Sequence, residues 1–441
     1  MFAWPKRRKT ERTRAPREPN RGKRFWITTL ICAAIALAIF FWYTSARVLS
    51  EPVSLDVGPA APEFAATLGP LVSAEFSGGN RIEPLLNGDE IFPAMLEAIR
   101  KAKRSVTLET YIWASGKISD EFIEAMSERA RAGVPVLVLA DGMGSLKFKR
   151  EDRDRLRSAG VKFVIYGREH WWQIKPNINH RTHRKILVVD GLVGFTGGMC
   201  IADEWLGAGD RPDVWRETGV RVQGPAVAQM QSVFATNWLQ TTGELMVGEA
   251  FFPPLGERGS SFAQCFKSGP GEDTERARIA YLLAIASARK SIKISHAYFV
   301  PDEMAMEMLV AARERGVDVE VVVPAKNDSR FGRAASRSRW GPLLAAGVKF
   351  YRFEPAMFHC KAMIVDDVFL TIGSVNFDNR SFAINDEMNI CVIDPIAVRE
   401  HVKVFERDRA QSTELTLEEF NARPFYVKAA DWFCGLFRSQ L

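Results

Sequence analysis

His183-Arg-Lys185-Ile-Leu-Val-Val-Asp190 and His359-Cys-Lys361-Ala-Met-Ile-Val-Asp366 follow one pattern, His-x-Lys-x4-Asp, which this 441-residue chain contains twice. Each copy runs through an apolar, strand-like segment, and a glycine follows each at the same offset, at Gly197 and Gly373. A single copy could arise by chance, because it needs only three common residues at fixed spacing. Two copies in the same context indicate one site built from two similar halves.

The sequence around the two motifs is also repeated. A strand-like segment at 105–111 has a counterpart at 291–298, and the pentapeptide Ala-Gly-Val-Lys-Phe occurs at 159–163 and again at 346–350. Apolar residues at helical spacing follow each of the first pair of strands. This alternation predicts an α/β fold of two tandem α/β/α sandwich domains, related by a pseudo-twofold axis and built on mixed, mostly parallel sheets. The repeat is far longer than a solenoid period, which favours a duplicated domain.

The N-terminal region differs sharply from the rest of the chain. Residues 1–24 hold ten Lys and Arg against two Glu, a net charge of +8, while the remaining residues carry a net charge of −2. The 22 residues 25–46 have no charged side chain, which predicts a transmembrane anchor that follows a basic cytoplasmic tail. A cleaved signal peptide ending near Ala46 is the alternative. The expected order continues with a linker at 47–76, a first domain at 77–247 and a second at 248–441.

These features predict a single-pass membrane protein whose body lies on the extracytoplasmic side. The near-neutral body lacks the basic excess that a nucleic-acid enzyme carries in its folded part, so no nucleic-acid partner is expected. The six cysteines show no metal-ligand spacing, and no cofactor or metal is expected for the chemistry.

The paired histidines suit attack on a phosphodiester. One histidine can attack phosphorus and form a phosphohistidine, while the other protonates the leaving oxygen and then deprotonates the incoming hydroxyl. Lys185 and Lys361 would neutralise the phosphoryl oxygens, since each lies on the same face of an extended strand as its histidine. Asp190 and Asp366 complete the two motifs, and either orient the local structure or reach the site through a turn.

Further candidates follow each motif. Glu217 and Glu387 lie 34 and 28 residues after the histidine of their own half, and each could fix a histidine tautomer by accepting its ring N–H. Ser374 and Asn376 would add a donor and an acceptor near the phosphate, or be ordinary turn residues.

These residues resemble those of the phospholipase D superfamily and, within it, the bacterial cardiolipin synthases. The likeness extends from about Ser77 to near the C-terminus and rests on both His-Lys-Asp motifs, on Tyr111-Ile112, on Tyr298-Phe-Val-Pro-Asp302, on Asn376-Phe-Asp378 and on Asn385-Asp-Glu387. The resemblance implies two phospholipase D-like domains and a phosphatidyltransferase that makes cardiolipin from two phosphatidylglycerols and releases glycerol. It also implies that His183 is the nucleophile and His359 the general acid and base. The partners would be phosphatidylglycerol and other membrane phospholipids.

Two alternatives use the same residues. A hydrolytic phospholipase D would let water accept the phosphatidyl group, and a phosphodiesterase or nuclease of the same superfamily would act on another diester. The C-terminal segment 424–437 has bulky apolar residues at helical spacing, which predicts an amphipathic helix that either lies in the lipid interface or docks onto the body.

Overall fold

The computed structural model describes residues 21–44, 49, 51–167 and 180–437. By its internal contacts the chain divides into two units, Met1–Ser50 and Glu51–Leu441. The first twenty residues of the predicted basic tail, and residues 45–46 of the predicted anchor, lie outside the described part. The larger unit contains both His-Lys-Asp motifs.

In the smaller unit, helix α1 (Arg21–Thr44) includes most of the predicted anchor. Over the residues that are described, no helix has the combination of length and apolar character required to cross a membrane. The anchor therefore stays a prediction.

The larger unit is built on one continuous sheet, which has fifteen strands over the described residues. The strands of the first half are β1 (Ser77–Leu86), β2 (Val106–Thr110), β3 (Val136–Asp141), β4 (Lys162–Tyr166), β5 (Ile186–Val189), β6 (Val193–Gly197) and β8 (Thr218–Gln223). Those of the second half are β9 (Ser261–Ser268), β10 (Ser291–His296), β11 (Asp318–Pro324), β12 (Lys349–Phe353), β14 (Lys361–Val365), β15 (Phe369–Gly373), β16 (Glu387–Ile393) and β17 (Ser412–Leu415).

The strand order is β17-β12-β11-β10-β14-β15-β16-β9-β1-β8-β6-β5-β2-β3-β4. Apart from the edge strand β17, each half has the same order read outward from the central β9–β1 pair, which is the pattern of a pseudo-twofold repeat. The two halves join there because β1 pairs with β9 in antiparallel register, Ser77 opposite Ala263. One sheet thus extends through both halves.

The prediction of mostly parallel sheets is wrong. Among the strand pairs of the described sheet, only β2–β3, β3–β4, β10–β11 and β11–β12 are parallel. Strands β5 and β14 lie within the two motifs, and tight turns connect them directly to the antiparallel strands β6 and β15. Such short connections can only join antiparallel neighbours, and strand–helix alternation is confined to the outer part of each half.

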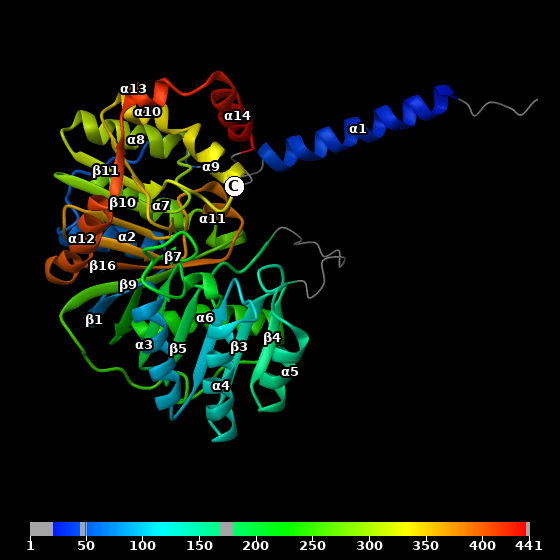
Figure 1. Cartoon of the computed structure of the whole chain (residues 1–441), viewed down its shortest axis with the longest axis vertical. Helices are drawn as coiled ribbons and strands as arrows, with labels where there is room; N and C mark the ends of the chain where they lie inside the picture. The colour runs from blue at the N-terminus through cyan, green and yellow to red at the C-terminus, as the bar shows by residue number, and fades with distance from the viewer. Residues whose placement is uncertain (1–20, 45–48, 50, 168–179, 438–441) are drawn as a thin grey trace, which may run out of the picture. The chain divides into compact units, whose positions relative to one another are not determined.

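Helices cover both faces of this sheet (Figure 1). The described α-helices of the larger unit are α2 (Pro62–Leu71), α3 (Asn87–Lys101), α4 (Lys117–Arg131), α5 (Arg150–Ser158), α6 (Ala226–Thr242), α7 (Arg276–Ser287), α8 (Glu303–Glu314), α9 (Arg330–Arg337), α10 (Trp340–Ala345), α11 (Asn379–Ala383), α12 (Pro395–Ala410), α13 (Leu417–Asn421) and α14 (Phe425–Gly435). One apolar cluster packs α3 and α4 onto the first half, and another packs α7 and α8 onto the second.

A third apolar cluster joins the halves. It contains Val227 and Met230 of α6 and Val398 and Phe405 of α12, packed against strands of both halves. Because this core is shared, the two half-repeats cannot separate without exposing buried apolar side chains to water. His183 and His359, which lie just before β5 and β14, are therefore held at a fixed separation.

Candidate active site

Both motif histidines are held by the opposite half of the molecule. The backbone N–H of His183 donates to the carbonyl of Asp386 over 2.9 Å, and that of His359 donates to the carbonyl of Arg216 over 2.8 Å. Near His359 the contact extends into a two-stranded parallel ladder of β7 (Trp215–Arg216) and β13 (Met357–Phe358). The same twofold arrangement thus positions both imidazoles, which lie in the buried centre of the molecule.

The glutamate partners are exchanged between the halves. Nδ1 of His183 lies 2.9 Å from Oε1 of Glu387, and Nδ1 of His359 lies 2.7 Å from Oε2 of Glu217. Each glutamate was expected to accept the ring N–H of a histidine, and the histidine that it contacts belongs to the opposite half. The carboxylates do contact ring nitrogens as expected, and the contact through Nδ1 leaves Nε2 of His183 for a substrate. Nε2 of His359 lies 3.2 Å from Nζ of Lys361.

The two lysines lie beside their histidines. Nζ of Lys185 donates to the carbonyl of His183 over 2.6 Å, and Nζ of Lys361 donates to the carbonyl of His359 over 2.8 Å. Burial lowers the pKa of Lys185 to about 8 and lowers the pKa of Lys361 in the same way. The charge of Lys361 also lowers the pKa of Lys185. An anionic phosphodiester between them would relieve this repulsion.

Both imidazoles are neutral at pH 7 without a substrate. Burial lowers the pKa of His183 well below its usual value, and the charges of Lys185, Lys361 and His359 lower it further. Burial and Lys361 lower the pKa of His359 to about 4, although Glu217 opposes this change. A neutral imidazole is the form that can act as a nucleophile.

The two carboxylates differ in charge state. Burial raises the pKa of Glu387 to about 7. For Glu217, burial acts in the same direction, but the hydrogen bond with His359, the charge of Lys361 and the backbone N–H of Thr218 act against it, and the pKa is lowered. Glu217 is therefore the fully charged partner, so His359 is the histidine whose protonated form is better stabilised.

Asp190 and Asp366 lie at the far end of the strands from the histidines. The Asp190 carboxylate accepts the backbone N–H groups of residues 103, 104 and 105, and that of Asp366 accepts those of residues 289, 290 and 291. Both aspartates have positive φ, a conformation that aspartate tolerates in turns. Of the two roles expected for these residues, the orientation of local structure is the one that fits this position.

The residues after β15 contribute differently from those after β6. The hydroxyl of Ser374 donates to Glu387 over 2.5 Å. At the matching position of the first half, Gly198 leaves the space that the Glu217 carboxylate occupies. Asn376 is buried, and nothing in the described part of the chain hydrogen-bonds to its Oδ1, whereas the matching residue is Cys200. The halves are thus similar in backbone but not in polar side chains.

Aromatic residues that the sequence analysis did not assign to the site surround the histidines. Tyr111 lies edge-on to His183, with ring centroids 4.9 Å apart. Trp205 and Trp215 lie 5.3 and 4.9 Å from His359, and Tyr298 lies 6.4 Å from it. Tyr111 and Tyr298 end matching segments of the repeat, a signal that could have identified them. The two tryptophans have no such signal.

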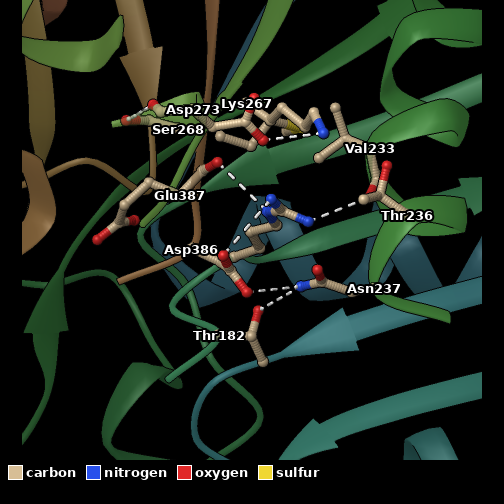
Figure 2. A network of polar contacts seen from close by, with 12 residues as sticks. Thr182, Val233, Thr236, Asn237, Lys267, Ser268, Asp273, Asp386 and Glu387 are labelled. Carbon is tan, nitrogen blue, oxygen red and sulfur yellow. Dashed lines mark hydrogen bonds and ion pairs between the residues drawn. The ribbon is translucent and has the colours of Figure 1, made fainter. Parts of the chain in front are cut away.

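A buried network of polar side chains surrounds Asp386, the residue whose carbonyl accepts the backbone N–H of His183. Asp386 accepts hydrogen bonds from the Tyr166 hydroxyl over 2.7 Å and from the Asn237 amide over 3.2 Å, and its Oδ1 lies 3.0 Å from His180. Figure 2 shows Asp386 beside Asn237 and Thr182. Burial would raise the pKa of Asp386, but the charge of Arg184 and the contacts with His180 and Tyr166 together outweigh it and lower the pKa to about 2. The network therefore contains a permanent negative charge next to Glu387.

Comparisons with known proteins show which proteins this chain resembles. A profile of the family described as "Cardiolipin synthase, PLD-like domain" matches residues 95–238 and 281–409. "Cardiolipin synthase 2" of Bacillus anthracis is 36% identical over 349 residues, which cover 79% of this chain and 68% of that protein. "Cardiolipin synthase" of Geobacillus kaustophilus is 36% identical over 349 residues, covering 79% and 70%. The crystal structure of phosphatidylserine synthase from Haemophilus influenzae has a similar fold, with a TM-score of 0.63 at 15% identity over 86% of this chain and 99% of that chain.

Proposed function

Because the chain belongs to the family of PLD-like cardiolipin synthases, we propose that it joins two molecules of phosphatidylglycerol into cardiolipin and releases glycerol. The chain is a phospholipid-synthesising enzyme of the phospholipase D superfamily, as its similarity to curated cardiolipin synthases over most of its length shows. We propose in addition its donor and acceptor lipids, its covalent intermediate and its anchoring in a membrane.

The first half-reaction transfers a phosphatidyl group to the enzyme. Nε2 of His183 attacks phosphorus, the bond from phosphorus to the headgroup glycerol oxygen breaks, and protonated His359 gives its proton to that oxygen. Lys185 and Lys361 balance the charge that accumulates on the phosphoryl oxygens. The anionic substrate raises the proton affinity of His359, which is how this imidazole obtains the proton that it donates.

The second half-reaction transfers the group to the acceptor. Neutral His359 takes the proton from a headgroup hydroxyl of a second phosphatidylglycerol, whose oxygen then attacks phosphorus. The phosphorus–nitrogen bond breaks and its electron pair returns to His183. Cardiolipin leaves, and His359 is protonated for the next cycle.

One observation supports this division of roles more than any other. The two imidazoles have exchanged carboxylate partners of unequal charge state, with the Glu217 pKa lowered and the Glu387 pKa raised to about 7. The fully charged Glu217 favours a proton on His359, whereas His183 lies among cations that keep it neutral. A nucleophile must be neutral and a general acid must be protonated, so this inequality matches His183 as nucleophile and His359 as acid and base.

The test is an analysis of lipid products. The full chain in mild detergent is given phosphatidylglycerol alone, beside His183→Ala and His359→Ala variants, and the products are resolved by mass spectrometry. We expect cardiolipin and glycerol, lost in both variants. Phosphatidic acid as the only product would show that water is the acceptor and would replace the proposal with hydrolysis.

We also propose that residues 25–46 anchor the protein in the bacterial inner membrane, with the body on the extracytoplasmic side. The +8 charge of residues 1–24 supports this orientation, because basic segments that flank a span stay in the cytoplasm. Alkaline phosphatase fused after residue 60 is expected to be active in cells, and β-galactosidase at the same point inactive. The opposite pattern would place the body in the cytoplasm.

A further inference from the structure

The C-terminal helix α14 docks onto the body through its polar side. Asp431 is buried, and its carboxylate forms ion pairs with Arg337 over 2.7 Å and with Arg423. One turn further, Gly435 lies against the side chain of Ser338, where a larger residue would clash. A buried aspartate with two arginine partners fixes the rotation of the helix, since turning it would leave charges unpaired.

This rotation places the large apolar side chains of the helix in the solvent. Their exposed fractions range from 46% to 85%, and they belong to Phe425, Tyr426, Trp432, Phe433, Leu436 and Phe437. A helix on the surface of a globular protein normally packs such residues against the core. In α14 the polar side faces the body and the apolar side faces the solvent. A contiguous exposed apolar patch of this kind marks an interaction surface.

The patch continues onto α9 and is bordered by positive charge. The ring of Phe331, itself exposed, lies 6.1 Å from that of Phe437. Lys326 and Arg330, which precede Phe331 in the chain, and Lys428 of α14 are exposed. We call Phe331 and the six apolar residues of 425–437 the aromatic face. Phe, Trp and Tyr beside Lys and Arg form the composition that favours the interface of an anionic bilayer.

A short chain of contacts connects the aromatic face to the site. Asp328, two residues before α9, accepts the hydroxyl hydrogen of Tyr298 over 2.5 Å, and the ring of Tyr298 lies edge-on to His359.

We propose that the aromatic face is a membrane-contact surface, which lies at the headgroup level of a phospholipid bilayer and holds the His359 side of the site against the lipid. The inference rests on the proposed function, because it assumes a substrate whose acyl chains stay in the bilayer. It adds a second point of lipid contact, independent of residues 25–46.

The test compares two double variants of the full chain. Trp432→Glu with Phe433→Glu places charge on the aromatic face, and Leu245→Glu with Val247→Glu does the same at two equally exposed apolar residues outside it. Rates are measured with phosphatidylglycerol in reconstituted vesicles of phosphatidylglycerol and phosphatidylethanolamine, and in detergent mixed micelles. We expect the first variant to lose about tenfold in vesicles and less than twofold in micelles, because glutamate opposes insertion into the interface. The control should change in neither.

Equal rates for the first variant and the wild type in vesicles would overturn the proposal. So would a lower oligomeric mass of this variant in detergent, because the aromatic face would then be an interface between copies. A second readout does not depend on activity. Brominated phosphatidylglycerol should quench the part of the tryptophan fluorescence that Trp432→Phe removes. Quenching without cardiolipin formation would retain the surface and reject the function, and absence of quenching would reject the surface.

Discussion

At the scale of single residues, the exchanged glutamates make a kinetic prediction. With a substrate whose leaving group is nitrophenolate, the first step needs no acid, so a burst of nitrophenol reports nucleophilic attack by His183 alone. Glu217→Gln impairs His359 and should retain the burst but slow the steady state on the order of 10²–10⁴-fold, the range seen when the residue that orients a catalytic histidine is neutralised. Glu387→Gln should lose the burst. Rapid-mixing absorbance measurements check this.

The histidine variants are the controls for this prediction. Glu217→Gln should behave like His359→Ala, and Glu387→Gln like His183→Ala, whichever histidine is the nucleophile. If each glutamate variant instead resembled the histidine variant of its own half, the exchange of partners would be refuted.

Glu109 makes a prediction on the pH dependence of stability. It is fully buried, and burial raises its pKa from 4.5 to about 7. Between these values the folded protein holds more protons at this group than the unfolded chain does, so the free energy of unfolding falls as pH rises through this window. A pKa difference of this size between the folded and unfolded states corresponds to about 3 kcal/mol in the free energy of unfolding.

Glu109→Gln removes the ionisation while its amide oxygen can still accept from Thr182 and Asn237. Relative to the wild type, the variant should therefore gain stability as pH is raised from about 4.5 to 8, by on the order of 3 kcal/mol. Urea denaturation at the two pH values measures the change. Exposed Glu124→Gln is the control and should show none, and a Glu109→Gln effect that is the same at both pH values would contradict the assignment.

At the scale of elements, the β7–β13 ladder depends on a buried ion pair with helix α12. The Arg216 guanidinium donates two hydrogen bonds to the Asp408 carboxylate, each over 2.8 Å, and both side chains are buried. The backbone carbonyl of Arg216 also accepts the N–H of His359, and Glu217 is the next residue in the chain. This pair therefore connects a helix of the second half to the glutamate of the first.

Asp408→Ala should destabilise the protein by about 3–5 kcal/mol, because it leaves a buried guanidinium without its partner. The substitution should also lower activity, because a shift of Arg216 would displace the adjacent Glu217 from His359. In contrast, Arg216→Met combined with Asp408→Leu replaces both charges and should recover most of the stability but not the activity. Urea denaturation and the product assay measure the two effects. Equal destabilisation by the single and double changes would show that packing, rather than charge burial, determines the cost.

At the scale of the whole molecule, both histidines of one site come from one chain, joined by a shared sheet and a shared core. A mixture of His183→Ala and His359→Ala proteins should therefore stay inactive, because each chain lacks one of the two groups that its only site needs. The product assay on a mixture refolded from urea tests this. Recovery of about one quarter of the wild-type rate would instead show a site assembled between exchanged chains.

The sequence by itself determined the candidate site residues and the twofold plan. Two copies of His-x-Lys-x4-Asp in repeated strands are local features, so His183, Lys185, His359 and Lys361 could be identified without coordinates. The matching strand order of the two halves follows from the same repeat. Periodicity could not show that most strand pairs are antiparallel, because an apolar run has the same pattern whichever neighbour it pairs with.

Only the tertiary structure decided which groups meet. Glu217 and Glu387 were predicted as histidine partners, but the closing of the two halves, and not the distance along the chain, pairs each with the opposite histidine. In the same way, the apolar spacing of 425–437 indicated an amphipathic helix, while the ion pairs of Asp431 decided that its aromatic side points outward. Contacts between residues far apart in the sequence set the partner of each charge, and spacing along the chain contains no record of them.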